Sequence, residues 1–475
     1  MRGIVVGAAL LLAGCTLGPR YERPPIEVPA AFRATADTQA EAWPAEDWWR
    51  NFHSDELDGL IGRARAFNQD LAAAAGRVLQ ADAQVRVSGA PLLPSLDATG
   101  GYSYQRTGLS SGRRTVTGAT VTGGRGSHYV DIRSYSIGLQ ASYDLDLFGR
   151  NRALLEAAQS SAIASRFDQE TVALAVVTSV ASTYFQVLSG QDRLRVAERN
   201  LRDAERVLAA FRARLAAGTA SALDVAQQEA LVAGQRAGIP NLRNAIEQQR
   251  IALGILVGLP PERLEVHGGS LEKLPVPMVA PGLPSTLLAR RPDVANAEAL
   301  LQSQNANIRA ARAAFYPDVS LTASAGLGSA ALSAITGPGT LVAALSASLV
   351  QSIFDNGQRQ GQLEFAQGRY AELVADYRRA VLQAFTDVEQ ALTALQYTTE
   401  QEALERQAVA VAQRSADIAN AQLQAGTIDI ITSLNTQQTL YSDLDLLTQI
   451  RLARFQALLN LYKALGGGFT VAGSP

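Results

Sequence analysis

Few side chains in this sequence have the types and spacing that enzyme chemistry needs. Gly108-Leu109-Ser110-Ser111-Gly112 fits the pattern of a serine nucleophile, but it lies in a glycine-rich stretch rather than between a strand and a helix. His53, His128 and His267 lie far apart, and none accompanies a cysteine or carboxylate cluster with the spacing of metal ligands. We therefore expect no catalytic residue, no metal and no cofactor, and we do not expect an enzyme.

Two further groups resemble functional sites only in composition. Asp144 and Asp146 are close enough in sequence to suggest a pair of carboxylates for acid and base catalysis. They are better explained as the point where a strand reaches water and a helix begins. The stretch 106–133 carries Arg113, Arg114 and Arg125 among many Gly, Ser and Thr residues, without the order of a phosphate-binding loop. We interpret it as an exposed loop between two strands.

The one cysteine of the chain is the best candidate for covalent chemistry. Arg2 precedes an apolar run, and Leu12-Ala13-Gly14-Cys15 resembles the lipobox of bacterial lipoproteins. That resemblance implies a signal peptide over 1–14, diacylglyceryl transfer to the Cys15 sulfur and acylation, for example by palmitate, of the new amino group. Two acyl signals give stable membrane anchoring. By analogy with lipoprotein sorting, the uncharged Thr16 favours the outer membrane over the inner one.

Composition indicates a folded protein without a nucleic-acid partner. The chain has 475 residues, of which 47% are hydrophobic and 18% charged, so it can bury a core. Without residues 1–14 its net charge is −3, which does not suit a polyanionic partner. The stretch 171–190 is uncharged, but it contains seven Ser, Thr and Gln residues, so we do not expect it to span lipid.

The positions of matching residues indicate two copies of one plan. Matching residues of the two copies differ in residue number by 223 before the first strand, by 206 along the second strand, and by 208 from there to the Ala-Gly-Thr turns. The drop from 223 to 206 means that the loop between the two strands is 17 residues longer in the first copy. The matching residues include Asp70 and Asp293, Pro94 and Pro317, Leu139 and Leu345, and Phe148 and Phe354. We therefore expect the domains 1–14 (signal peptide), 15–45 (lipidated tether), 46–260 (first repeat), 261–284 (connector), 285–468 (second repeat) and 469–475 (tail).

Each copy contains a pair of predicted strands. Alternation of apolar and polar residues marks 135–145 and 341–349, with partners near 93–105 and 319–327, each about 10 residues long as a tilted transmembrane strand requires. Four strands cannot close a barrel, and open sheet edges are not tolerated in lipid. Two chains would give 8 strands and three chains 12, with room for a lumen. The alternative is a four-stranded sheet of a soluble protein, with its apolar face against helices.

After each strand pair the sequence predicts a long helix that folds back on itself. Residues 151–217 contain no proline and carry a heptad row, and at 1.5 Å per residue the helix would reach about 100 Å. Its counterpart covers 358–425, and the return helices cover 221–257 and 429–464. The heptad row comprises Val180, Val187, Leu194, Leu201, Leu208 and Leu215. The folds are at Ala217, Gly218 and Thr219 and at Ala425, Gly426 and Thr427, where glycine ends a helix. A dimeric coiled coil is the alternative.

Several stretches in this order are similar to the outer-membrane factors of tripartite efflux systems, the lipoprotein branch of the TolC-like family. They are Cys15–Tyr21, Trp48–Phe52, Asp144–Arg150, Arg291–Val294 and Asn460–Gly468. The resemblance implies a mixed α and β membrane protein, a homotrimer whose shared 12-strand barrel crosses the outer membrane and continues as a helical tunnel in the periplasm. It also implies contact with outer-membrane lipid, and a periplasmic adaptor and an inner-membrane pump as partners, with the adaptor at the Ala-Gly-Thr turns.

The resemblance also places a periplasmic gate just after each turn. In relatives a hydrophobic residue is followed by an acid four residues later and an arginine three further; here the positions hold Ile431, Asn435 and Gln438. The first copy has Leu223 and Gln227 there, with Asp224 beside them, where the second copy has Thr432. An ionic lock of the family's kind cannot form with these residues. Asp224 is either a first-turn acid favoured by the helix dipole or part of a cation-attracting ring.

The function that follows is passive export of small molecules that the pump delivers. The chain has no nucleotide-binding loop, so the energy must come from a partner. The alternatives are the exit duct of a type I protein secretion system and a periplasmic coiled-coil lipoprotein without a pore. Nothing in the sequence names the exported substrate.

Overall fold

The computed structural model describes residues 20–33, 43–108, 114–116, 119–121, 129–279 and 284–470. The expected signal peptide, Cys15, the motif around Ser110 and His128 lie outside these residues. The chain has two compact units. The first comprises 81–162 and 300–373 together with 1–22, and the second comprises 23–80, 163–299 and 374–475.

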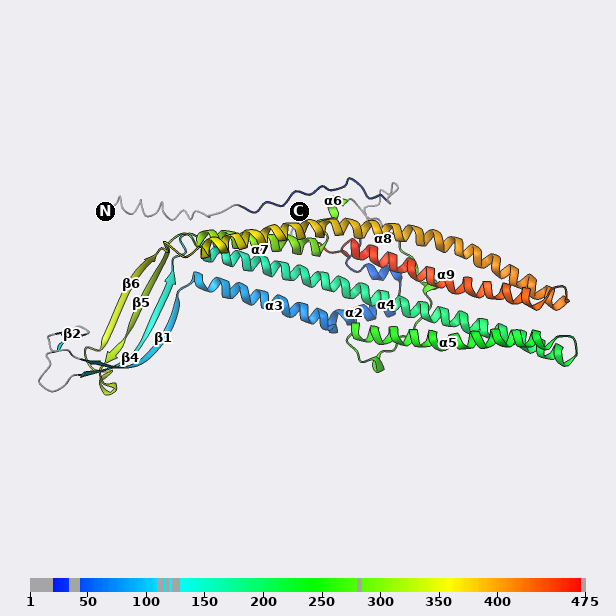
Figure 1. Ribbon diagram of the computed structural model, residues 1–475, viewed down its shortest axis with the longest axis horizontal. Coiled ribbons are helices and arrows are strands. Elements are labelled where there is room, and N and C mark those ends of the chain that lie inside the picture. The colour runs from blue at the N-terminus through cyan, green and yellow to red at the C-terminus, as the bar shows by residue number, and fades with distance from the viewer. Residues whose placement is uncertain are drawn as a thin grey trace. The chain divides into compact units, whose positions relative to one another are not determined.

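The chain has long helices joined by short turns, and a single larger sheet (Figure 1). Up to Leu256 the helices and strands are η1 (Trp48–Phe52), α2 (Asp55–Phe67), α3 (Gln69–Gly89), η2 (Ala90–Leu92), β1 (Ser95–Gly108), β2 (Arg114–Val116), β3 (Ala119–Val121), β4 (Tyr129–Asp144), α4 (Arg150–Ala216) and α5 (Ala222–Leu256). Beyond it are η3 (Pro261–Arg263), η4 (Leu271–Lys273), α6 (Pro284–Leu287), α7 (Pro292–Ala313), β5 (Asp318–Ser329), η5 (Leu332–Ala334), β6 (Leu341–Val350), α8 (Gln358–Ala425) and α9 (Ile430–Ala464). The predicted helices and strands are confirmed, most bounds within three residues. The interpretation of 106–133 as a loop is wrong in part, because β2, β3, the end of β1 and the start of β4 lie within this stretch.

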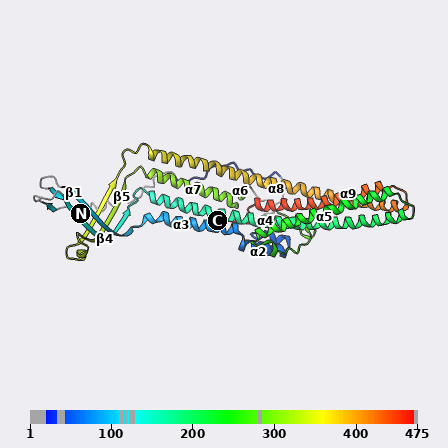
Figure 2. The same ribbon diagram turned by 60° about the horizontal axis from the view of Figure 1, so that its bottom comes forward.

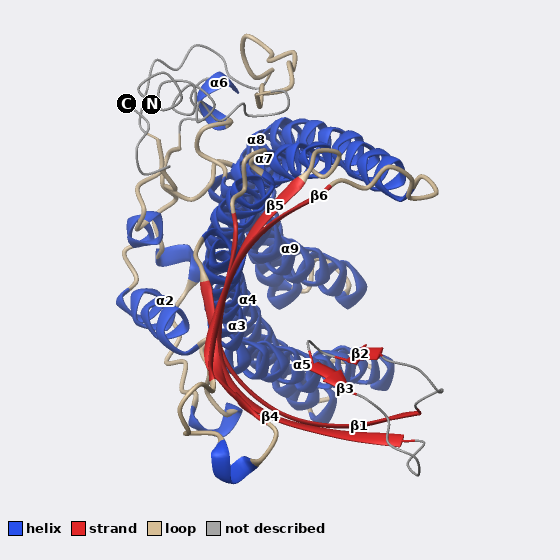
Figure 3. Cartoon of the chain, turned by 90° about the vertical axis from the view of Figure 1, so that its left-hand side faces the viewer, coloured by secondary structure: helices blue, strands red, loops and turns tan. Residues whose placement is uncertain are grey.

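The first unit contains a four-stranded antiparallel sheet in the order β1-β4-β5-β6 (Figure 3) and a two-stranded antiparallel sheet of β2 and β3. Its register aligns Leu96, Ala141, Ala323 and Leu345 in one row across all four strands. The next row holds Ser95, Ser142, Thr322 and Ser346. Because side chains alternate between faces along a strand, one face of the sheet is apolar and the other is hydroxyl-rich.

The apolar face of this sheet is uncovered. Leu139 is 52% exposed and Leu345 is 82% exposed, so no described helix packs over them. This differs from the soluble alternative, in which helices would cover the apolar face. The outer edges of the sheet, β1 and β6, each pair with one strand only among the described residues.

The long helices start where aspartates at strand exits accept backbone N–H groups. Asp146 accepts hydrogen bonds from the N–H groups of Asn151 and Arg152 at 2.9 and 3.0 Å, and it adopts a positive φ of 36°. Asp355 accepts from the N–H groups of Gly357 and Arg359 at 3.1 and 3.3 Å before α8. An anion at a helix N-terminus satisfies otherwise unpaired donors. The prediction that a helix starts beside Asp146 is confirmed.

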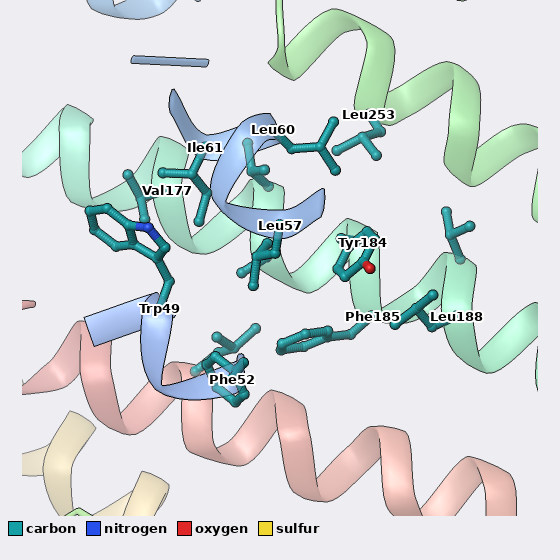
Figure 4. Packing of buried hydrophobic residues seen from close by; sticks show 14 of the residues in the cluster. Trp49, Phe52, Leu57, Leu60, Ile61, Val177, Tyr184, Phe185, Leu188 and Leu253 are labelled. Atoms are coloured by element: carbon teal, nitrogen blue, oxygen red, sulfur yellow. The ribbon is translucent and has the colours of Figure 1, made fainter. Parts of the chain in front are cut away.

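The second unit has its main core around the N-terminal aromatic segment (Figure 4). Trp49 and Phe52 of η1 pack with Leu57 of α2 and Phe185 of α4, and Trp48 stacks on Tyr462 of α9 with ring centroids 4.5 Å apart. Among the described residues, α4 alone is long and apolar enough to cross a membrane by length and composition, and half of that stretch is buried. Val177, Phe185 and Leu188 of α4 belong to this core.

Buried ion pairs hold the end of the chain to the start of α7. Arg291 is buried and donates to Asp293 at 2.6 Å, lies 2.9 Å from Asp387 of α8, and donates to the carbonyl of Ala464 at 3.2 Å. Arg291 would lose proton affinity through burial, but the two carboxylates outweigh burial and raise its pKa. The Arg-Pro-Asp sequence is thus a structural clamp at the C-terminal end of α9.

Candidate functional site

The predicted site lies at the turns of two helical hairpins, α4 with α5 and α8 with α9 (Figure 2). Gly218 and Gly426 end the long helices with φ of 72° and 73°, in the left-handed region that favours glycine. The N–H of Thr219 donates to the carbonyl of Arg214 at 2.8 Å, and that of Thr427 donates to the carbonyl of Gln422 at 2.9 Å. These bonds across five residues form the same Schellman turn in both hairpins, as the Ala-Gly-Thr sequences predicted.

The return helices begin with two different arrangements of the same cap. In α5 the Ser221 hydroxyl accepts from the N–H of Asp224 at 3.1 Å, while the Asp224 carboxylate accepts from the N–H of Ser221 at 2.8 Å. In α9 the acid stands first, and Asp429 accepts from the N–H of Thr432 at 2.8 Å. Hydrogen bonds from Thr432 lower the pKa of Asp429. Each turn therefore carries one carboxylate at a helix N-terminus.

Sequence reasoning found Asp224 and missed Asp429. The position that matches Asp224 in the second hairpin is Thr432, and this difference predicted a loss of charge there. The structure shows that the charge moves three positions instead, from the N3 position of the cap (Asp224) to the N-cap (Asp429). The pattern Asp429-Ile430-Ile431-Thr432 was the signal, since aspartate is among the preferred N-cap residues.

The two hairpins pack against each other near the turns. Leu208 and Phe211 of α4, Val225 of α5, Leu423 of α8 and Ile430 of α9 belong to one buried cluster. Arg214 adds a polar link, because its guanidinium donates to the carbonyls of Leu423 and Gln424 at 3.3 and 3.4 Å. A cation near the C-terminal carbonyls of a helix is favourable. Arg214 thus ties the last turn of α4 to the last turn of α8.

The predicted gate residues lie close to these turns, and four of the six are exposed. Leu223 is 64% exposed and Ile431 is 51% exposed. Asn435 and Gln438 are exposed, whereas Asp224 and Gln227 are half-buried. Within the described part of one chain, no hydrogen bond joins any two of these six side chains.

Ion pairs farther from the turns join α4 to α9 and α8 to α9. Arg193 of α4 donates to Asp445 of α9, at 2.6 Å from Nε to Oδ1 and 3.0 Å from the second nitrogen to Oδ2. Glu402 of α8 is buried and accepts from Arg451 and Arg454 of α9 at 3.0 and 2.9 Å. Burial alone would raise the pKa of Glu402, but the hydrogen bonds from Arg454 and Arg451 lower it. These partners are 252, 49 and 52 residues apart, and no short motif signals them.

The chemistry of the two turns is that of helix caps and packing. Among the described residues, no three His, Cys, Asp or Glu side chains lie close enough to hold a metal ion. The turns present exposed apolar residues, two carboxylates and backbone groups already bonded within the turn.

The family model for outer membrane efflux proteins matches residues 60–259 and 283–467. The chain belongs to the outer membrane efflux protein family. The two matched segments enclose both hairpins and the whole four-stranded sheet. The protein is therefore an efflux protein of the Gram-negative outer membrane, and the family consists of efflux channel proteins rather than enzymes.

Curated relatives match over nearly the full length. The pyoverdine export outer membrane protein OpmQ of Pseudomonas aeruginosa is 40% identical over 465 residues, which cover 98% of this chain and 96% of the relative. The cation efflux system protein CusC of Escherichia coli K12 is 31% identical, over 97% of this chain and 98% of the relative. The recognised family and the efflux function are confirmed.

Solved structures share the fold. A membrane protein from Pseudomonas aeruginosa superposes with a TM-score of 0.86 at 30% identity, covering 96% of this chain and 98% of its own. CusC superposes with a TM-score of 0.84 at 28% identity, covering 95% of this chain and 100% of its own. The mixed α and β fold of outer membrane efflux channels is thereby established for this chain.

Proposed function

We propose that three copies of this chain form a lipid-anchored channel that passively exports small molecules across the outer membrane. The observation that carries the proposal is the sheet with two open edges, β1 and β6, and an exposed apolar face. In lipid, each unpaired backbone group costs several kcal/mol, so the edges must pair with other copies. Two copies give about 8 strands and a filled interior, whereas three give about 12 and leave a lumen.

The polarity of the two faces supports this arrangement. Leu139, Leu341 and Leu345 suit contact with lipid on the apolar face. On the other face, hydroxyl groups bond across strands: Ser95 with Ser142 at 2.8 Å, and Thr322 with Ser346 at 2.6 Å. This face suits a water-filled lumen.

We infer that the chain is a duplicated unit, with repeats over 46–260 and 285–468 and a connector over 261–284. The 35-residue lengths of α5 and α9, and the 67 and 68 residues of α4 and α8, support this inference. The division of the family match at 259 and 283 supports it as well. Six hairpins from three copies would then form the periplasmic tunnel.

The gate, on this proposal, is where the return helices of three copies meet. The exposed Leu223 and Ile431 are available to pack around the axis, and Asn435 and Gln438 supply amide groups there. A gate of this kind is held by packing and amide hydrogen bonds, since exposed ion pairs are often worth under about 1 kcal/mol. The turns at 217–219 and 425–427 would contact the adaptor.

The partners follow from the absence of an energy source in the chain and from its relatives. A passive channel needs a periplasmic adaptor and an inner-membrane pump, and Cys15 would carry the lipid anchor. OpmQ is named for pyoverdine export and CusC for cation efflux. Since relatives of similar length differ in cargo, we assign the choice of solute to the pump and propose no specific solute.

The decisive experiment combines assembly with conductance. The lipidated protein, extracted from the outer membrane, should show the mass of a trimer by native mass spectrometry and discrete single-channel currents in a planar bilayer. Trimers without currents would favour a periplasmic scaffold. A deletion strain should become sensitive to a drug or metal, whereas loss of a secreted protein with unchanged sensitivity would favour a type I secretion duct.

A further inference from the structure

An apolar row on α8 is left uncovered by the rest of the chain. Its four side chains recur every seven residues, and each is between 56% and 61% exposed: Tyr397, Leu404, Val411 and Ile418. A seven-residue spacing keeps side chains on one face of a helix in a coiled coil. The buried face of α8 is a different one, formed by Ala412, Ala416, Ala419 and Leu423. A row of this kind marks an interaction surface.

The corresponding face of α4 shows what covers such a row within one chain. Positions 208 residues earlier are Ser189, Val196, Asp203 and Ala210, and this face of α4 lies against α9. Val196 and Ser442 line one cavity, Asp203 and Tyr441 line another, and Arg193 bonds to Asp445. The side chains that α9 presents to α4 are large: Leu434, Gln438, Tyr441 and Asp445.

The counterpart of α9 in the first hairpin is α5, and its matching face is bare. The positions 208 residues before the four large side chains of α9 are all alanines, and all are exposed: Ala226, Ala230, Ala233 and Ala237. They form a row separate from the buried Val225, Val232 and Ile239. The large and small side chains are therefore distributed in opposite ways in the α4–α9 contact and on the two exposed faces. In the chain, α4 has the smaller side chains and α9 the larger; on the exposed faces, α8 has the larger and α5 the smaller.

We propose that the α8 row of one copy packs on the alanine row of α5 in the next copy, with Val411 between Ala230 and Ala233. This register is taken from the α4–α9 contact within the chain, where Asp203 lies beside Tyr441, one turn from Gln438. The offset of 208 residues relates Asp203 to Val411, Tyr441 to Ala233 and Gln438 to Ala230. The two rows are different surfaces, so this contact is head-to-tail and closes into a ring. The inference rests on the proposed trimer and specifies its periplasmic joint.

The two joints of the ring then differ in chemistry. The joint within a copy has the Arg193–Asp445 ion pair. The corresponding positions between copies are Gln401 and Ala237, which cannot form one. Contact between copies is thus made by apolar side chains seated on alanines, and it is insensitive to salt.

Disulfide trapping tests the register directly. The full-length, lipidated protein would carry Val411→Cys with Ala230→Cys, or Val411→Cys with Ala233→Cys, in the background of the native Cys15. After oxidation, at least one pair should give covalent dimers and trimers on a denaturing gel. Each single variant should give none, and Val196→Cys with Ser442→Cys should close within one chain without a gain in mass.

A size variant keeps the test decisive if disulfide geometry is poor. Ala233→Trp should abolish the trimer seen by native mass spectrometry, whereas Gln235→Trp, on the face of α5 that lines the cavity with α9, should retain it. A wild-type trimer that neither pair traps and that Ala233→Trp leaves intact would overturn the joint while leaving the proposed function standing. A wild-type monomer would overturn the trimer, and the joint with it.

Discussion

Arg193 of α4 and Asp445 of α9 are joined by a two-pronged ion pair that links the two hairpins of one chain across 252 residues of sequence. Both hairpins end in exposed turns, and this pair lies between those turns and the main core. Both side chains are about one-third exposed, so water and salt weaken the attraction. The pair nevertheless fixes geometry, because two parallel hydrogen bonds from one guanidinium restrict rotation.

Breaking this pair should loosen the hairpins. Arg193→Gln is expected to cost about 1 kcal/mol per copy and to raise single-channel conductance in a planar bilayer at low salt. The matched control is Arg195→Gln, because Arg195 bonds to Asp192 within α4 and links no second helix. Equal conductance of Arg193→Gln and the wild type at low salt would show that the pair does not restrain the tip.

The helices and strands were predictable because local rules determine them. Alternation of apolar and polar residues marked β4 and β6, and the absence of proline marked α4. Long-range side-chain pairs were not predictable. Arg193 and Asp445 are ordinary surface residues by composition, and the pairing of Glu402 with Arg451 and Arg454 depends on the register of two antiparallel helices, which no local pattern specifies.

Removal of the Glu402 charge should destabilise the second hairpin more than any surface change. Glu402→Gln leaves the buried Arg451 with only the exposed Glu272 at 3.6 Å and leaves the half-buried Arg454 without its anion, which is expected to cost about 3 kcal/mol. Thermal unfolding of the purified protein at pH 7 measures this loss of stability. Glu400→Gln, an exposed neighbour on the same helix, should have no effect. A melting temperature of Glu402→Gln equal to that of Glu400→Gln would contradict the proposed role.

The same site predicts a pH dependence. Because the folded-state pKa of Glu402 is lowered, its contribution to stability is complete above the unfolded value of about 4.3 and is lost as pH falls through the folded value. The difference in melting temperature between the wild type and Glu402→Gln should therefore be constant from pH 6 to 8 and shrink below about pH 4. A difference that grows on acidification has the wrong sign for this account.

Substitution of a turn glycine should destabilise the protein, whereas substitution of a glycine in the middle of a helix should stabilise it. Gly426→Ala places a β-carbon at a φ of 73° and is expected to destabilise the second hairpin by about 1 kcal/mol. Gly368→Ala in the interior of α8 meets open space and should stabilise by about 0.5–1 kcal/mol. Urea or thermal unfolding of both variants should thus shift in opposite directions, and shifts of one sign would refute the conformational argument.

Lipidation at Cys15 is predicted from the sequence motif alone. Cys15→Ser should abolish incorporation of a palmitate analogue in growing cells, because serine lacks the thiol that accepts diacylglycerol. Thr16→Asp is the informative companion, since it should keep the label and shift the protein toward the inner-membrane fraction. Labelling that persists in Cys15→Ser would remove the anchor from the proposal.

The two cap carboxylates separate a structural from an electrostatic role. Asp224 bonds to the N–H of Ser221 and Asp429 to that of Thr432, so each stabilises a helix start regardless of any channel function. Asparagine keeps an acceptor oxygen at both positions but removes the charge. If three copies bring these carboxylates around the axis, Asp224→Asn and Asp429→Asn should each reduce cation preference, measured as a reversal potential across a salt gradient.

Ser221→Ala is the control, because it weakens the cap by about 1 kcal/mol without changing charge. Unchanged selectivity in both asparagine variants would leave Asp224 and Asp429 as helix caps only, and the tip would then select solutes by size.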